Sequence, residues 1–225
     1  MAGVVVLLAV LATLTAVAVV IGTGVATMAA MVAAVVALLA RAWLPRLARS
    51  AFARGALGRA ERLYRLCQAL AWSRARRTAA RVSVAAVMLA GGRHDDGAAL
   101  LDSIGDEALA GAEPGTRAGW LNNRAYAALR LGATGPAAAR ALEQVRAAIA
   151  LGLDAPAVLH TEGLAVLALG RADAAVQGFE RLWRDAELRP RLEAERCLDL
   201  ARAWTALDED AYAADYRDRA RQAGR

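Results

Sequence analysis

The pattern of apolar and polar positions divides the chain into three parts. Residues 1–40 carry no charged side chain and are mostly apolar, whereas arginines alternate with apolar residues from 45 to 77. From 78 to 225 the apolar positions recur with the spacing of amphipathic helices. We therefore predict an all-α chain with an anchor at 1–44, an arginine-rich helical connector at 45–77 and a helical repeat domain at 78–225.

The uncharged segment is long enough to cross a membrane, since about 18 consecutive apolar residues already indicate a span. As one straight helix it would be about 55 Å long, well beyond the hydrocarbon core of about 30 Å. Gly22 and Gly24 flank Thr23 and favour a turn at residues 21–24. We predict a transmembrane hairpin with helices near 3–21 and 24–43. A single tilted helix near 22–43 is the alternative.

Charge sets the expected orientation of this anchor. No basic residue precedes the apolar run, which argues against a cleaved signal peptide, whereas eleven arginines and the single acid Glu61 lie between Arg41 and Arg81. Basic residues next to a span stay on the cytoplasmic side. Because all 28 basic residues are arginines in a chain rich in Ala, Gly and Val, we expect a GC-rich bacterial genome. The expected location is the bacterial inner membrane, with the repeat domain in the cytoplasm.

The arginine-rich connector suits a helix that lies on an anionic lipid surface, because leucines recur among its arginines. Nucleic-acid binding is the alternative use of such a patch, but the patch adjoins an anchor and carries no reading motif, so we expect none. The residues expected to contact lipid headgroups and to fix the topology are Arg41, Arg46, Arg49, Arg54 and Arg59.

Four predicted helix-to-helix turns recur at intervals of 40, 38 and 38 residues. They are Gly92, Gly132, Gly170 and Asp208. Seven residues before each turn and five residues after it the chain has a small residue, as two closely crossing helices require. The first series is Ala85, Ala125, Gly163 and Ala201, and the second is Gly97, Ala137, Ala175 and Ala213. One period therefore predicts helix, turn and helix.

Residues 156–189 carry a more specific pattern of large, small and aromatic positions. Its members are Leu159, Gly163, Val166, Gly170, Ala175, Phe179 and Leu182. With these residues the chain resembles the tetratricopeptide repeat (TPR) family over residues 78–222. The period of 38 residues, against about 34 in the family, leaves an irregular helical bundle as the alternative.

The resemblance implies a short α-solenoid of three to four helix pairs, with a concave face that holds a protein or peptide. It places first-helix side chains on that face, namely Asn122, Tyr126, Arg130, His160, Leu164, Asp199 and Arg202. Among them, Asn122, Arg130 and Arg202 would hold a peptide backbone or a carboxylate.

The sequence shows no catalytic motif. The compact cluster His94-Asp95-Asp96 follows a predicted turn, where an aspartate that caps a helix accounts for it, and the other histidine, His160, lies on a different repeat. The two cysteines, Cys67 and Cys197, match no metal or redox spacing. We expect no metal, no cofactor and no enzymatic activity.

These observations predict a membrane-tethered scaffold or adaptor that binds a cytoplasmic protein or peptide. The alternative is a structural membrane protein that self-assembles through its hairpin and repeats, as in a compartment coat or a secretion assembly.

Overall fold

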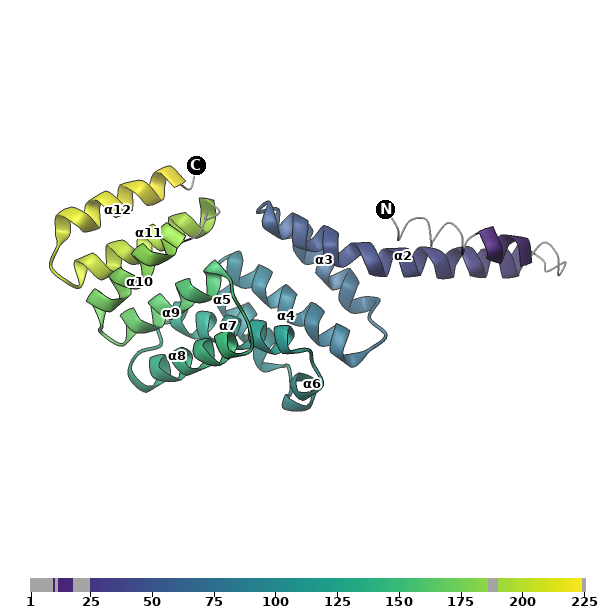
Figure 1. The fold of residues 1–225 in the computed structure, drawn as a ribbon, viewed down its shortest axis with the longest axis horizontal. Coiled ribbons are helices and arrows are strands. Elements are labelled where there is room, and N and C mark those ends of the chain that lie inside the picture. The colour runs from purple at the N-terminus through teal and green to yellow at the C-terminus, as the bar shows by residue number, and fades with distance from the viewer. Residues whose placement is uncertain (1–9, 11, 18–24, 186–189, 224–225) are drawn as a thin grey trace.

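The computed structural model describes residue 10 and residues 12–17, 25–185 and 190–223, and in these ranges the regular structure is helical. A short helical stretch at residues 12–17 comes before the longer helices. The further helices are α2 (Val25–Ala53), α3 (Leu57–Ala69), α4 (Arg74–Ala90), α5 (His94–Asp102), α6 (Asp106–Ala110), α7 (Pro114–Arg130), α8 (Gly135–Ala150), α9 (Pro156–Ala168), α10 (Ala172–Asp185), α11 (Pro190–Thr205) and α12 (Asp210–Ala223). Figure 1 shows them as successive pairs that follow an arc.

The four turns expected from the sequence are confirmed, and each ends a first helix in the same way. At Gly92 the backbone N–H donates to the Leu89 carbonyl, and the N–H of Arg93 donates to the Met88 carbonyl. This hydrogen-bond pattern needs a positive φ at its central residue. The φ angles are 78° at Gly92, 89° at Gly132, 76° at Gly170 and 60° at Asp208. Asp208 is the only residue other than glycine with a positive φ in the described ranges.

The predicted small residues lie where paired helices cross. Ala85, Ala125, Gly163 and Ala201 are all buried. A Cβ atom on Gly163 would lie 2.6 Å from Cε1 of Phe179, so only glycine allows α9 and α10 to approach this closely. The second series holds except at Ala137, which is only partly buried. α8 begins three residues after its turn residue, whereas α5, α10 and α12 begin two residues after theirs, so Ala138 and Ala141 occupy the buried positions there.

The segment expected to be a connector contains a further helical pair. The C-terminal half of α2 turns at Gly55, with φ 74°, into α3. Ala48 and Ala51 of α2 pack with Tyr64 of α3 and with Val87 of α4 in one apolar cluster. Among the described residues, the predicted repeat domain has four helical pairs, within the expected three to four, and α2 and α3 add a fifth pair before it. The five-residue helix α6 is an extra element between α5 and α7.

The structure tests only part of the predicted anchor. The turn at 21–24 and most of the helix near 3–21 lie outside the described residues, and α2 begins at Val25. In the ranges that the structure describes, no helix is both long and apolar enough to cross a membrane. The predicted transmembrane hairpin thus has no support from the structure.

Candidate functional site

The first helices of three successive pairs enclose a groove, which we call the α7–α11 groove. It has a volume of about 490 Å³, and Gly92 and His94 at the turn between α4 and α5 also line it. Its apolar lining includes Leu129, Leu164, Leu167 and Leu198. Its polar lining consists of His94, Tyr126, Arg130, Thr134, Arg191, Glu195 and Arg202.

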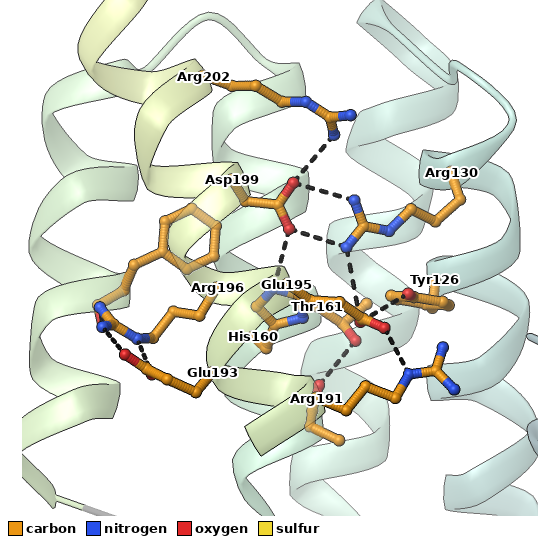
Figure 2. A network of polar contacts seen from close by, with 12 residues as sticks. Tyr126, Arg130, His160, Thr161, Arg191, Glu193, Glu195, Arg196, Asp199 and Arg202 are labelled. Atoms are coloured by element: carbon orange, nitrogen blue, oxygen red, sulfur yellow. Dashed lines mark hydrogen bonds and ion pairs between the residues drawn. The ribbon is translucent and has the colours of Figure 1, made fainter. Parts of the chain in front are cut away.

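Asp199 of α11 is the centre of a polar network at this groove, and its side chain is fully buried. Arg130 of α7 donates from its two terminal nitrogens to the two carboxylate oxygens, at 2.9 and 2.8 Å (Figure 2). Nε2 of His160 on α9 lies 3.0 Å from Oδ2, and Nη1 of Arg202 donates to Oδ1 at 3.0 Å. One carboxylate therefore joins the first helices of three consecutive pairs.

The charges of this network determine the pKa of Asp199. Burial raises the pKa of a carboxyl group, but here the hydrogen bond with His160 and the charge of Arg130 outweigh burial and hold the pKa below its usual value. Burial likewise disfavours the charged form of Arg130, yet Asp199 raises the pKa of this guanidinium overall. At neutral pH both groups are therefore charged.

A second carboxylate, Glu195, lies one helical turn before Asp199. Its Oε2 accepts a hydrogen bond from the Tyr126 hydroxyl at 3.0 Å, and its Oε1 accepts one from Nε of Arg191 at 2.9 Å. Arg130 reaches the same carboxylate at 3.8 Å and stacks over the Tyr126 ring at 5.1 Å. Burial raises the pKa of Tyr126 to about 12, so its hydroxyl stays protonated and donates.

Five of the seven residues predicted for the concave face meet in this network. They are Tyr126, Arg130, His160, Asp199 and Arg202, and Leu164 lines the groove beside them. Asn122 does not line the groove; it is buried, and its Oδ1 has no hydrogen-bond partner among the described residues. Arg130 was expected to hold a partner's carboxylate, and in the structure its two terminal nitrogens already donate to Asp199.

The sequence analysis missed Arg191 and Glu195. Both lie on α11 at intervals of four residues before Asp199, and residues four apart share a helix face. That spacing was the available signal.

The arginines predicted to contact lipid lie at the other end of the array. Arg46, Arg49, Arg54 and Arg59 are exposed, and the side chain of Arg41 is outside the described residues. Lipid contact stays a prediction for all of them.

The structure also places the residues that the sequence suggested as possible ligands, beginning with those at the start of α5. Arg93 is the N-cap of α5, and Asp95 and Asp96 lie in its first turn, so the expected aspartate cap is wrong. The two carboxylates still interact favourably with the positive end of the helix dipole. Within the described residues there is no group of three or more side chains suited to a metal. Burial and the nearby Glu193 raise the pKa of Cys197 to about 12, which keeps its thiol protonated.

No protein-family model and no curated protein sequence matches the chain. Among solved structures, the crystal structure of BtubC (BKLC) from P. vanneervenii superposes with a TM-score of 0.52 at 20% identity, covering 88% of this chain and 84% of that one. MamA (MSR-1 C2) gives a TM-score of 0.44 at 15% identity, over 82% of this chain and 96% of that one. A Podosopora anserina putative kinesin light chain with TPR-like repeats gives a TM-score of 0.43 at 19% identity, over 82% of this chain and 96% of that one. The BtubC likeness shows the fold alone: an all-α, TPR-like helical-repeat solenoid.

Proposed function

We propose that the chain is a scaffold or adaptor that holds a protein or peptide partner in the α7–α11 groove. The observation that carries this proposal is a groove shared by three helical pairs, with apolar side chains beside guanidinium groups that reach solvent. The side chain of Arg202 is 66% exposed and that of Arg191 is 42% exposed. Such a surface combines apolar anchoring with directional hydrogen bonding.

The polar network holds the side chains of the groove walls in place before a partner binds. Asp199 fixes Arg130 and His160 from two other helices, so the groove walls need little reordering when a partner binds. Arg202 uses one nitrogen for Asp199, and its other N–H groups remain able to donate to a carboxylate or a peptide carbonyl. Leu198, which is 47% exposed, offers an apolar contact one helical turn before Arg202.

The proposal gives the chain no catalytic role. A general acid or base needs a pKa near the working pH. Tyr126 has a pKa of about 12, and the pKa of Asp199 lies below its usual value, so neither exchanges protons readily at neutral pH.

The proposal includes tethering to the cytoplasmic face of a bacterial inner membrane through residues 1–44. This part rests on the sequence, namely the charge-free residues 1–40 and the eleven arginines that follow. A reporter fused after Arg225 should be active in the cytoplasm, and membrane fractions should keep the chain through an alkaline wash. Reporter activity only outside the cytoplasm would overturn the orientation.

Groove binding is tested by capture from bacterial cells with the full chain and two matched variants. Leu198→Glu places a charge in the groove, whereas Leu159→Glu makes the same change at a residue of α9 that is 40% exposed and does not line the groove. We expect the native chain and Leu159→Glu to capture one defined foreign protein, and Leu198→Glu to capture at least tenfold less.

Two results would count against the adaptor. Equal capture by both variants would place the partner elsewhere on the chain. Capture of only other copies of this chain, together with assembly of the purified protein in sedimentation experiments, would favour the self-assembling membrane protein.

A further inference from the structure

The pair formed by α2 and α3 lies at one end of the array, opposite α11 and α12 (Figure 1). One side of this pair is covered by α4 through Ala48, Ala60 and Tyr64. The other side is exposed along α3 and along the C-terminal part of α2 from Trp43 on. We call it the α2–α3 face.

Basic and apolar side chains share this face. On α3 and its C-cap Leu70, the exposed residues Arg59, Arg62, Leu66 and Leu70 follow one another at intervals of three and four, which places them on one stripe. On α2 the exposed Trp43 lies three and four residues before the exposed Arg46 and Leu47, and the exposed Arg54 follows the end of the helix at Ala53.

The positive charge of the α2–α3 face is not neutralised by nearby acids. The single acid of this pair, Glu61, is 13% exposed and is bound by Arg65 at 2.7 Å and by Arg93. Five exposed arginines of the pair form no ion pair with a carboxylate of the described residues: Arg46, Arg49, Arg54, Arg59 and Arg62. Several exposed arginines elsewhere do, such as Arg124 with Asp102 and Arg219 with Asp215.

Large apolar side chains at the same end are also unusually exposed. Trp72, just after α3, is 66% exposed, and Trp43 is 51% exposed. Leu47, Leu66 and Leu70 are 44%, 49% and 39% exposed. Leucine side chains make no favourable contact with the phosphates of a nucleic acid. Leucine and tryptophan among arginines instead suit the boundary between lipid headgroups and acyl chains. The apolar component therefore favours lipid over nucleic acid.

We propose that the α2–α3 face docks on an anionic lipid bilayer, with its arginines on the headgroup phosphates and its tryptophans and leucines at the acyl boundary. Charge complementarity carries the choice of partner. The proposal concerns the first helical pair of the array and does not depend on the partner in the α7–α11 groove or on a span at residues 1–44.

Docking is measured on the full chain in vesicles whose lipids carry brominated acyl chains, which quench nearby tryptophan. The vesicles consist of phosphatidylcholine alone or of phosphatidylcholine with phosphatidylglycerol. The signal of Trp72 is the difference between the native chain and Trp72→Phe. We expect this difference to be quenched at least twofold more with phosphatidylglycerol than without it, and the extra quenching to disappear in high salt.

Arginine variants identify the charges responsible. Arg54, Arg59 and Arg62 are replaced together by Gln, and the matched control replaces the exposed Arg140, Arg146 and Arg171 of other pairs. Each arginine near an anionic surface shifts docking by about fivefold, so the first variant should lose the extra quenching and the control should keep it. The salt dependence of the native chain gives the same test without any substitution.

Equal quenching of Trp72 in neutral and anionic vesicles would overturn the proposal. So would unchanged lipid quenching in the Arg54, Arg59 and Arg62 variant combined with loss of its retention by single-stranded RNA, because the face would then bind nucleic acid. Failure of the groove proposal is seen separately, since the groove is judged by capture with Leu198→Glu.

Discussion

Replacing Asp199 by alanine tests whether the network holds the repeats together. The substitution removes the acceptor of Arg130, His160 and Arg202 at once. The side chains of Arg130 and His160 are only 13% and 1% exposed, so water replaces little of what they lose. Both groups would be left buried with unmet hydrogen bonds.

The expected loss is large for a single substitution. Removing one partner of a buried ion pair costs about 3–5 kcal/mol of unfolding free energy. In a chain of this size each kcal/mol corresponds to about 2–4 °C in the melting temperature. Asp199→Ala should therefore melt about 10 °C below the native chain. Because the lost contacts join α7, α9 and α11, the loss should concentrate in the three pairs from α7 to α12.

The assay is urea and thermal unfolding followed by circular dichroism, with hydrogen exchange to locate the change. Asp215→Ala is the matched control, since Asp215 pairs with Arg219 at 2.7 Å while 51% exposed. Such a surface pair contributes less than about 1 kcal/mol. A result in which both variants lose the same small amount would refute the idea that this carboxylate joins the repeats.

Further predictions concern packing, a turn and pH. Gly163→Ala should cost about 1–3 kcal/mol because its Cβ would meet the Phe179 ring at 2.6 Å, whereas Gly178→Ala, with open space around it in a helix, should gain about 0.5–1 kcal/mol in urea unfolding. Asp208→Gly should raise the melting temperature, since the φ of 60° strains any residue with a Cβ by about 1 kcal/mol. The pKa of Tyr126 is raised from 10.0 to about 12. Its protonated hydroxyl therefore contributes fully to the free energy of unfolding below pH 10, and this contribution is lost as the pH rises toward 12. In alkaline unfolding experiments, Tyr126→Phe should lose less unfolding free energy than the native chain between pH 10 and 12.

The turns were predictable because their cause is local. Gly92, Gly132 and Gly170 sit where the backbone needs a positive φ, and the small residues before them are required by helices only a few residues away. Gly55 lies 37 residues before Gly92 and continues the same period, but the surrounding arginines led to its interpretation as part of a connector. Three of the four buried residues that the first pair contributes to its apolar cluster are alanines, Ala48, Ala51 and Ala60, which give little periodic signal.

From the sequence, the site could be predicted only as a set of residues that share one face of the array. Helical spacing places Tyr126 and Arg130 together on one helix, and Asp199 and Arg202 together on another. That Arg130 meets Asp199, 69 residues away, depends on how three pairs stack and on the rotation between them. Spacing within one helix carries no information about that rotation. The sequence therefore could not predict that Asp199 is buried or that it binds the guanidinium of Arg130.

Site-specific photo-crosslinking in living cells tests the central claim most directly. A photoreactive amino acid replaces Leu198 in the α7–α11 groove, and in the matched control it replaces Leu159 outside the groove. The account predicts one discrete crosslink to a foreign protein from position 198 that is lost when Arg202→Glu is added, and none to that protein from position 159. A crosslink that forms equally from both positions, or only to another copy of this chain, would contradict it.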